Sequence, residues 1–585
     1  MRQLRRLLPY LARHRRRLLI GLGCLLVTTA LSVASPWVLR HAVDDLTRAV
    51  TRQKLWLYAG LLMGLVVLEG VFRYFMRMGL IRLSREIEFE LRDDIFAHLT
   101  RLPARFYQSH RVGDVMSRAV NDLSAVRMVL GPGIMYTAST LATAIGTLAL
   151  MLRISPRLLG LALIPLVFVS GLVRYFGRRI HDRFERVQDQ LANISSLVQE
   201  NLAGARVVRA YAQEANEQRR FAEANQEYLR RNRNLIRMYV ALYPGIQVLM
   251  GTGAVLVLWL GGRQVVSGTI TLGEFVAFGA YLAMLHWPMI ALGWVVNLFE
   301  RGEAAMGRLA TILDTAPEIR DQDPLPVDEL RGAVEFRGLT FAFGEDGPPV
   351  LHEIDLSVPA GTTVAIVGPT GSGKSALVSL IPRLYDPPPG TVFVDGHDVR
   401  RLPLGVLRGA VGFVPQETFL FSDTVAANVA VGLAGNGDGD GRDPRLDWAA
   451  GVAQLSKDVA DFPRGFDTLL GERGITLSGG QRQRAALARA LAMDPRILIL
   501  DDSLSAVDTQ TEEDILGALR AVMAQRTTFL VSHRVSTVKD ADLIVVLREG
   551  RIVERGTHRE LLARGGFYAD LHRRQLLEEE MERTA

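Results

Sequence analysis

The residues with the clearest capacity for chemistry form a glycine-rich loop in the second half of the chain. An apolar run, Val-Ala-Ile-Val, precedes the loop at residues 364–367, and an apolar helical pattern follows it. In a strand–loop–helix setting, glycines let backbone N–H groups converge on phosphate oxygens, a lysine reaches the β- and γ-phosphates, and a hydroxyl ligates Mg²⁺. The sequence therefore predicts a nucleoside triphosphate site at Gly368, Pro369, Thr370, Gly371, Ser372, Gly373, Lys374 and Ser375.

Two further motifs follow this loop. Residues 497–500 read Ile-Leu-Ile-Leu and are followed by Asp501 and Asp502. A strand that ends in a carboxylate beside the loop can hold the Mg²⁺ shell, so we expect Asp501 to join Ser375 as a metal ligand. Between loop and strand lies Leu-Ser-Gly-Gly-Gln at residues 477–481. Alone this turn indicates a helix N-cap, but its place between the loop and the acidic strand favours a role with nucleotide.

The elements that position these motifs divide the chain in two. The first half holds apolar stretches of about 20 residues, the length that crosses ~30 Å of hydrocarbon. We expect α-helical spans, because only a helix satisfies its own backbone hydrogen bonds in lipid. Six are predicted, at residues 17–43, 55–81, 129–152, 156–177, 238–261 and 269–297.

The second half has an ordinary soluble composition with frequent glycine and proline. The predicted fold is a six-span transmembrane domain at residues 1–314, a proline-rich acidic linker at 315–332, and an α/β P-loop nucleotide-binding domain with a helical subdomain at 333–585.

Arginine distribution predicts the orientation. Seven arginines lie within the first seventeen residues, directly before the first apolar run, and the long connections 82–128 and 178–237 are also basic. The positive-inside rule places these segments in the cytoplasm. The net charge of +6 is therefore explained by membrane orientation, and we expect no nucleic-acid partner. Cys24 is the only cysteine, which excludes an intrachain disulfide.

The long connections have a helical pattern rather than that of loops. Ile87, Leu91 and Ile95 are spaced four apart among acids and bases, and a structureless loop of this length is uncommon. We expect helical stalks whose end turns, at residues 111–114 and 205–211, contact the soluble domain.

Three other features leave alternatives open. Glu69 and Arg73 stand four apart in the second predicted span, so they can form a structural ion pair or line a substrate cavity. His286-Trp287-Pro288 predicts a kink in the sixth, serving a moving gate or ordinary packing. Residues 435–441 alternate Gly with Asn or Asp, but they lack the terminal glutamate of a calcium loop and indicate a surface loop.

Together the motifs and spans resemble the ATP-binding-cassette (ABC) transporters of the exporter type over essentially the whole chain. The resemblance implies that Phe343 stacks on adenine, where the family usually has Tyr. It implies that Gln416 senses Mg²⁺, as a third metal ligand beside Ser375 and Asp501, and contacts the membrane domain. It also implies that His533 is the γ-phosphate switch.

The resemblance extends to contacts between subunits. Ser478, Gly479, Gly480 and Gln481 match the signature that closes on the γ-phosphate of nucleotide held by the opposite subunit. Residues 505–508 resemble the loop that couples the two nucleotide sites. Residues 111–114 and 207–212 resemble the coupling helices.

One position departs from the family pattern. After the strand aspartate the family normally has glutamate, the base that polarises the attacking water, whereas this chain has Asp502. Its carboxylate is one methylene shorter, a loss of about 1.5 Å of reach. A misplacement of ~1 Å can reduce a rate about 10²-fold. The resemblance implies Asp502, His533 and Gln416 as the catalytic residues, and the short reach of Asp502 predicts a site that binds ATP tightly and hydrolyses it slowly.

The intact signature predicts a competent site on a different partner chain. Residues 500–508 and 117–122 especially resemble the degenerate half of bacterial heterodimeric multidrug exporters. A homodimer with two slow sites is the alternative. We expect ATP-driven export of amphipathic compounds across a bacterial inner membrane, with the N-terminus and the cassette in the cytoplasm.

The sequence also bears on four functions other than drug export. A lipid or peptide translocator stays open, and so does a gated channel on the same scaffold. The fusion of membrane and nucleotide domains disfavours an importer. The membrane spans exclude the soluble chromosome-maintenance ATPases that share the signature.

Overall fold

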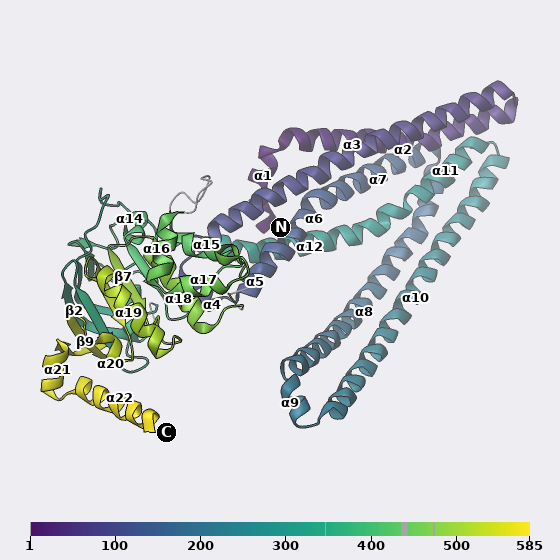
Figure 1. Ribbon diagram of the computed structural model, residues 1–585. Helices are drawn as coiled ribbons and strands as arrows, with labels where there is room; N and C mark the ends of the chain where they lie inside the picture. The colour runs from purple at the N-terminus through teal and green to yellow at the C-terminus, as the bar shows by residue number, and fades with distance from the viewer. Residues whose placement is uncertain (1, 345–346, 434–442, 472–473, 475, 585) are drawn as a thin grey trace. The chain divides into compact units, whose positions relative to one another are not determined.

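The computed structural model describes residues 2–584 except 345–346, 434–442, 472–473 and 475 (Figure 1). The glycine-rich stretch 435–441 therefore lies outside the described residues. The chain forms two compact units: one comprises Met1–His98 and Gly113–Asp314, the other Leu99–Val112 and Thr315–Ala585. Each is described below by itself.

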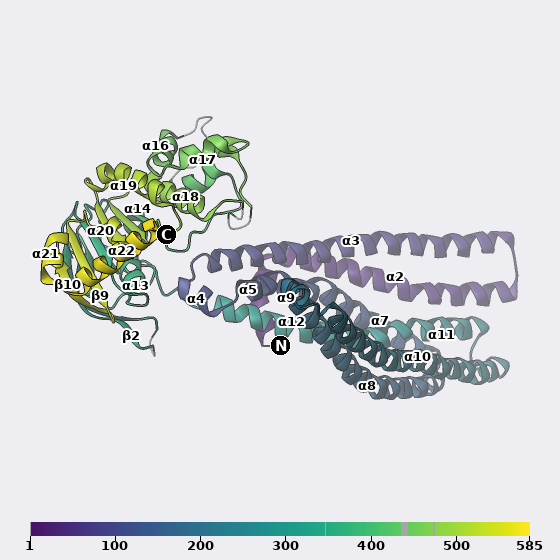
Figure 2. The same ribbon diagram turned by 60° about the horizontal axis from the view of Figure 1, so that its bottom comes forward.

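The first unit is built from long helices. Its principal helices are α2 (Arg15–Arg48), α3 (Arg52–Leu99), α7 (Ile134–Ile154), α8 (Pro156–Ala203), α10 (Glu214–Val266), α11 (Leu272–Met284) and α12 (His286–Leu313). The segment that leads into α7 is also helical. It contains α5 (Val112–Ser117) and α6 (Leu123–Met128), and a π-helical turn follows each of them: η2 (Arg118–Asp122) and η3 (Val129–Gly133). The predicted stalks are helical, since α3, α8 and α10 extend well beyond the apolar stretches. The short α9 (Ala205–Ala210) joins α8 to α10, which lie side by side (Figures 1 and 2).

Within the described residues, five helices are long and apolar enough to cross a membrane, so the predicted count of six is not confirmed. The predicted span at 269–297 is divided at Leu285 into α11 and α12. Pro288 explains the division, because it has no N–H to donate to the carbonyl of Met284. The division lies where His286-Trp287-Pro288 predicts a kink.

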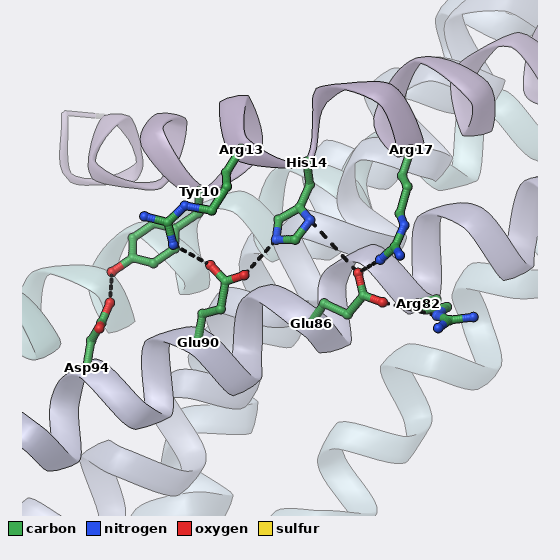
Figure 3. A network of polar contacts seen from close by, with 8 residues as sticks. All are labelled: Tyr10, Arg13, His14, Arg17, Arg82, Glu86, Glu90 and Asp94. Carbon is green, nitrogen blue, oxygen red and sulfur yellow. Dashed lines mark hydrogen bonds and ion pairs between the residues drawn. The ribbon is translucent and has the colours of Figure 1, made fainter.

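The N-terminal segment, η1 (Gln3–Leu7) and α1 (Leu8–Arg13), is fastened to α3 and α12. Glu303 accepts hydrogen bonds from the backbone N–H groups of Gln3 and Leu4, and Arg6 forms a bidentate ion pair with Asp314 at 2.7 and 2.8 Å. Toward α3, three acids spaced four residues apart share one face. Figure 3 shows the resulting ladder: Tyr10 to Asp94, Arg13 and His14 to Glu90, and His14, Arg17 and Arg82 to Glu86.

The second unit contains two sheets. Four strands, in the order β2 (Pro349–Val358), β1 (Val334–Ala342), β4 (Val392–Val394) and β5 (His397–Asp398), pair antiparallel. Six form the order β10 (Arg551–Gly556), β9 (Leu543–Arg548), β3 (Thr363–Val367), β8 (Thr527–Val531), β7 (Ile497–Asp501) and β6 (Val411–Val414), parallel except for β10 at the edge. Because the carboxyl ends of parallel strands meet at one edge, the loops after β3, β6, β7 and β8 converge there.

Helices cover this unit and complete its core. In both views α16 (Pro444–Val452), α17 (Leu455–Asp461) and α18 (Gly479–Ala492) lie together, away from β10 and α21 (His558–Arg564) (Figures 1 and 2). The remaining helices are α4 (Ala104–Ser109), α13 (Lys374–Ser379), α14 (Leu404–Gly409), α15 (Val425–Val429), η4 (Ala430–Gly432), η5 (Gly465–Asp467), α19 (Thr509–Met523), α20 (Val535–Val538) and α22 (Phe567–Thr584).

Candidate nucleotide-binding site

Residues from six separate segments line one cavity of about 270 Å³ at the carboxyl edge of the parallel sheet. Phe343 follows β1, Gln416 follows β6, and His533 follows β8. The loop after β3 and the end of β7 supply the others that the sequence predicts, namely Thr370, Gly371, Gly373, Lys374, Ser375, Asp501 and Asp502. Val350, Ala376 and Val531 also line the cavity. They carry no functional pattern that the sequence could have revealed.

The glycine loop has the close backbone packing that its composition predicts. A Cβ at Gly368 would lie 2.0 Å from the carbonyl oxygen of Leu547. Gly373, at the N-cap of α13, has φ +97°, a left-handed conformation that favours glycine. Larger residues at either position would displace the loop from β9 or strain its backbone.

Lys374 is 6% exposed, and its ammonium group is held by its own loop. Nζ donates to the carbonyl oxygens of Gly368 and Pro369 at 2.9 and 2.8 Å. Burial lowers the pKa of Lys374, and the carboxylates of Asp501 and Asp502 oppose this shift. The loop carbonyls and the two acids therefore keep a charged group near the place where phosphate oxygens would bind.

Asp501 has the chemistry of a metal ligand. Its side chain is buried, and Oδ1 has no hydrogen-bond partner. Burial raises the pKa of Asp501, and the Ser375 hydroxyl opposes the rise. The described residues hold no group of three or more His, Cys, Asp or Glu side chains that could bind a metal. Mg²⁺ is usually held by one or two protein oxygens together with substrate phosphates, and Asp501 with Ser375 fits that arrangement.

Asp502 borders the same cavity and has an unusual backbone. Its φ of 47° lies in the left-handed region, which aspartate tolerates better than most residues. The Asp502 N–H donates to the Val531 carbonyl at 2.9 Å, and the Ser505 hydroxyl donates to the Asp502 carbonyl at 3.0 Å. Its backbone is therefore held on both sides.

The comparisons with known proteins agree with this geometry. Residues 18–289 match the model of the ABC transporter transmembrane region, and residues 351–505 match the ABC transporter model. A probable multidrug resistance ABC transporter ATP-binding/permease protein of Bacillus subtilis, YheI, is 36% identical over 96% of this chain and 95% of its own length. The chain belongs to the ABC transporter family.

Other relatives and a solved structure cover nearly the whole chain. The multidrug resistance-like ATP-binding protein MdlA of Escherichia coli is 34% identical over 99% of this chain and 97% of that protein. An ATP-dependent lipid A-core flippase of Syntrophus aciditrophicus is 34% identical over 99% and 95%. The structure of a bacterial Atm1-family ABC exporter with ATP bound has a TM-score of 0.78 and 30% identity, covering 96% of this chain and 98% of that one.

This ABC transporter is therefore an exporter with the type I exporter fold. It combines a helical transmembrane domain with an ATP-binding domain. It is a multi-pass membrane protein and an ATP hydrolase coupled to transport.

The predicted signature residues of this ABC transporter do not line the cavity. Ser478 is the N-cap of α18, where its hydroxyl accepts from the N–H of Gln481 at 3.2 Å in a capping box. A Cβ on Gly480 would lie 3.1 Å from the Ala506 carbonyl oxygen, and Gly479 also approaches Ala506. The structure thus separates Ser478, Gly479, Gly480 and Gln481 from the phosphate loop of the same chain and packs Gly479 and Gly480 against the loop that follows Asp502.

An aromatic contact beside the cavity is one that the sequence does not predict. The Phe343 ring meets the Tyr385 ring edge-on, with 5.0 Å between centroids. The hydroxyl of Tyr385 accepts a 2.7 Å hydrogen bond from Gln108 on α4. The stalk-end contact at residues 111–114 stays a prediction. The hydrogen bond of Gln108 comes from α4 at 104–109, which forms part of the second unit.

Proposed function

We propose that this chain exports amphipathic or hydrophobic compounds across the cell membrane as one half of a heterodimeric ABC exporter. The observation that carries this proposal is Asp502 beside an otherwise complete nucleotide cavity. The cavity supplies the means of binding ATP, while the shorter carboxylate reduces its hydrolysis. A chain whose own site hydrolyses ATP slowly needs a partner chain whose site hydrolyses it faster.

Nucleotide binding uses groups that the loop already brings together. Lys374 turns from the Gly368 and Pro369 carbonyls toward the β- and γ-phosphates, and Phe343 stacks on adenine. Ser375, Gln416 and Asp501 would hold Mg²⁺, which neutralises charge on the phosphate oxygens when it is bound. His533 donates to the γ-phosphate, which makes the site sensitive to whether ATP or ADP is present.

Asp502 takes the proton of the attacking water during phosphoryl transfer to water. A positioned base contributes about 10²–10⁴-fold to such a rate. At Asp502 the carboxylate retracts by about 1.5 Å relative to glutamate, so most of this contribution is lost while ATP affinity is retained. Bound ATP then holds two cassettes together for longer than one turnover of the partner's site.

The partner's site uses this chain's signature. Ser478, Gly479, Gly480 and Gln481 stand on α18 apart from their own phosphate loop, as expected of residues that close on nucleotide held by another subunit. Ser478 presents its hydroxyl at the N-terminus of a 14-residue helix, where phosphate charge is favourable. The second subunit is proposed to be a different chain with glutamate after its strand aspartate. The pair is proposed to lie in a bacterial inner membrane with both cassettes in the cytoplasm.

The decisive experiment compares the chain alone with the chain plus a candidate partner. We expect the chain alone to bind ATP and hydrolyse it slowly, and Asp502→Glu to raise the rate at least tenfold. Exporter-like hydrolysis by the unmodified chain, with no gain from Asp502→Glu, would refute the slow-site proposal. Lys374→Ala serves as the control that must abolish ATP binding.

A lipid translocator is the second candidate, favoured by the relatives named as lipid A-core flippases. Reconstitution separates the two functions. Fluorescent lipid moved between leaflets with no transport of amphipathic dyes into inside-out vesicles would favour lipid as substrate. ATP-dependent dye accumulation supports the proposed export.

A further inference from the structure

The segment that carries His533 lies over a second cavity. This cavity measures about 140 Å³, and its lining includes Ser532, His533, Arg534 and Thr537. Protein interiors are ordinarily close-packed, so a side chain beside a void has fewer contacts that fix its position. Within the segment the Arg534 N–H donates to the Ser532 hydroxyl at 3.0 Å, and hydrogen bonds from neighbouring elements add to this hold.

Glu512 on α19 supplies the hold on one side. It is 4% exposed, accepts a 2.6 Å hydrogen bond from the Thr537 hydroxyl, and pairs with Arg534. Both contacts go to side chains. They fasten α20 and the residue after His533, but they leave the peptide groups next to His533 without a partner from α19.

Gln575 on the C-terminal helix α22 supplies those contacts. Its Nε2 donates to the carbonyl oxygen of His533 at 2.5 Å, and its Oε1 accepts from the N–H of Val535 at 2.8 Å. A carbonyl can only accept and an N–H can only donate, which fixes the orientation of the carboxamide. Val535 begins α20, so its N–H has no partner within that helix.

One side chain therefore bridges the two peptide groups on either side of Arg534. The bridge fixes the backbone conformation directly after His533. It thereby fixes the position of the backbone from which the imidazole extends. The cavity lies beside His533 and Arg534, so side chains pack less closely there than around Val535, which is buried in the core.

We infer that Gln575 is a positioning residue that acts on bound nucleotide through His533. This inference rests on the proposed function, in which His533 contacts the γ-phosphate. Gln575 itself touches no nucleotide. Its loss should weaken the interactions that depend on the γ-phosphate and leave the others intact, because Lys374, Phe343 and the glycine loop lie on other segments.

The test measures ATP and ADP affinity of the purified full-length chain, since ADP lacks the γ-phosphate. Gln575→Met preserves the length of the side chain and removes both hydrogen bonds. Arg574→Ala is the matched control: it changes the adjacent, exposed residue, for which the described contacts include no hydrogen bond or ion pair. We expect Gln575→Met to weaken ATP binding about tenfold, with ADP binding within twofold of the unmodified chain.

A double-variant cycle identifies the route. His533→Ala should produce the same selective loss, and His533→Ala with Gln575→Met should lose no more than His533→Ala alone. Additive losses, unchanged ATP affinity, or an equal loss for ATP and ADP would each overturn the inference. The proposed function fails separately, if Lys374→Ala retains ATP affinity.

Discussion

Gln108 donates a hydrogen bond to the hydroxyl of Tyr385, with 2.7 Å between nitrogen and oxygen. Gln108 lies on α4, a few residues after the end of α3, while Tyr385 contacts the Phe343 ring at the nucleotide cavity. One hydrogen bond and one ring contact thus join the segment after a membrane helix to the proposed adenine contact. The two hydrogen-bonded residues are 277 positions apart in the chain.

Tyr385→Phe should uncouple these parts without removing the ring. We expect nucleotide affinity within twofold, because the contact with Phe343 remains, and a several-fold smaller stimulation of ATPase by transported compounds. The measurement is ATPase activity of the reconstituted exporter with and without compound. Tyr107→Phe is the control, since the Tyr107 hydroxyl donates to the carbonyl of Leu99 at the end of α3, and its loss leaves the Tyr385 hydrogen bond in place. An equal effect of both variants would contradict the prediction.

Ser478→Ala should separate helix capping from action on a partner's nucleotide. Ser478 and Thr557 both form capping boxes, at the starts of α18 and α21. Replacing either by alanine should destabilise the second unit by about 1 kcal/mol. Only Ser478→Ala should also lower hydrolysis by the assembled exporter, measured beside apparent melting temperatures. If Thr557→Ala lowers hydrolysis as well, the effect of Ser478→Ala is explained by the lost helix cap, and the proposed action of Ser478 on the partner's nucleotide is contradicted.

Lowering the pH should weaken Mg²⁺-dependent ATP binding. The loss should begin at a higher pH than it would if Asp501 had the usual pKa of an aspartate. Burial raises the pKa of Asp501, and only the ionised carboxylate ligates a cation well. Affinity is therefore full above the raised pKa and falls as pH drops through it. Titrating ATP affinity against pH, with and without Mg²⁺, checks this. A pH dependence of equal size without Mg²⁺ would exclude Asp501 as its source.

Asp502→Glu should reduce stability slightly while raising hydrolysis. With φ at 47°, Asp502 adopts a backbone conformation that aspartate tolerates better than glutamate, and we expect a loss below about 1 kcal/mol. Asp323, with φ at 44°, is an exposed linker residue and the matched control. Asp323→Glu should lower the apparent melting temperature comparably without changing ATPase activity. A gain in ATPase activity from both variants would contradict the prediction, because it would show that the rate does not depend on the position of the carboxylate at residue 502.

Glu86→Gln combined with Glu90→Gln should loosen the N-terminal segment. His14 and Arg13 hold the pKa of Glu90 below its usual value of 4.5, so the ladder in Figure 3 contributes stability above that pH and loses it as pH falls through the folded value. Each partly exposed pair contributes less than about 1 kcal/mol. Faster hydrogen exchange of residues 3–17 is the readout. Glu227→Gln, which breaks only pairs within α10, should leave that exchange unchanged.

The motif-bearing residues could be placed from sequence because they follow buried strands directly. Lys374, Asp501 and His533 come just after β3, at the end of β7 and just after β8, so the order of parallel strands brings them to one edge. Local spacing is enough to predict such a site. The helical character of the long connections follows from the same kind of local pattern.

Tyr385, Glu512 and Gln575 could not be predicted in this way. Their contacts depend on segments that meet only in the folded unit, and none of the three stands in a motif. The hydrogen bond from α4 could not be predicted for the same reason: the sequence predicts a stalk-end contact at residues 111–114, and packing adds the hydrogen bond of Gln108. The sixth predicted span, at residues 269–297, is divided in the structure for a different reason. Its residues are apolar on both sides of Pro288, so the hydropathy pattern predicts one span, but Pro288 lacks the N–H that a continuous helix needs.

The division at Leu285 has a mechanical consequence. Bending a continuous helix stretches its backbone hydrogen bonds. Pro288 removes the hydrogen bond to the Met284 carbonyl, so bending between α11 and α12 meets less resistance than bending within either helix. Leu285 is packed in the apolar core with Tyr281 and Ala277, which shelters the freed carbonyl region from acyl chains. The break between α11 and α12 is thus a point at which these two helices can bend relative to each other.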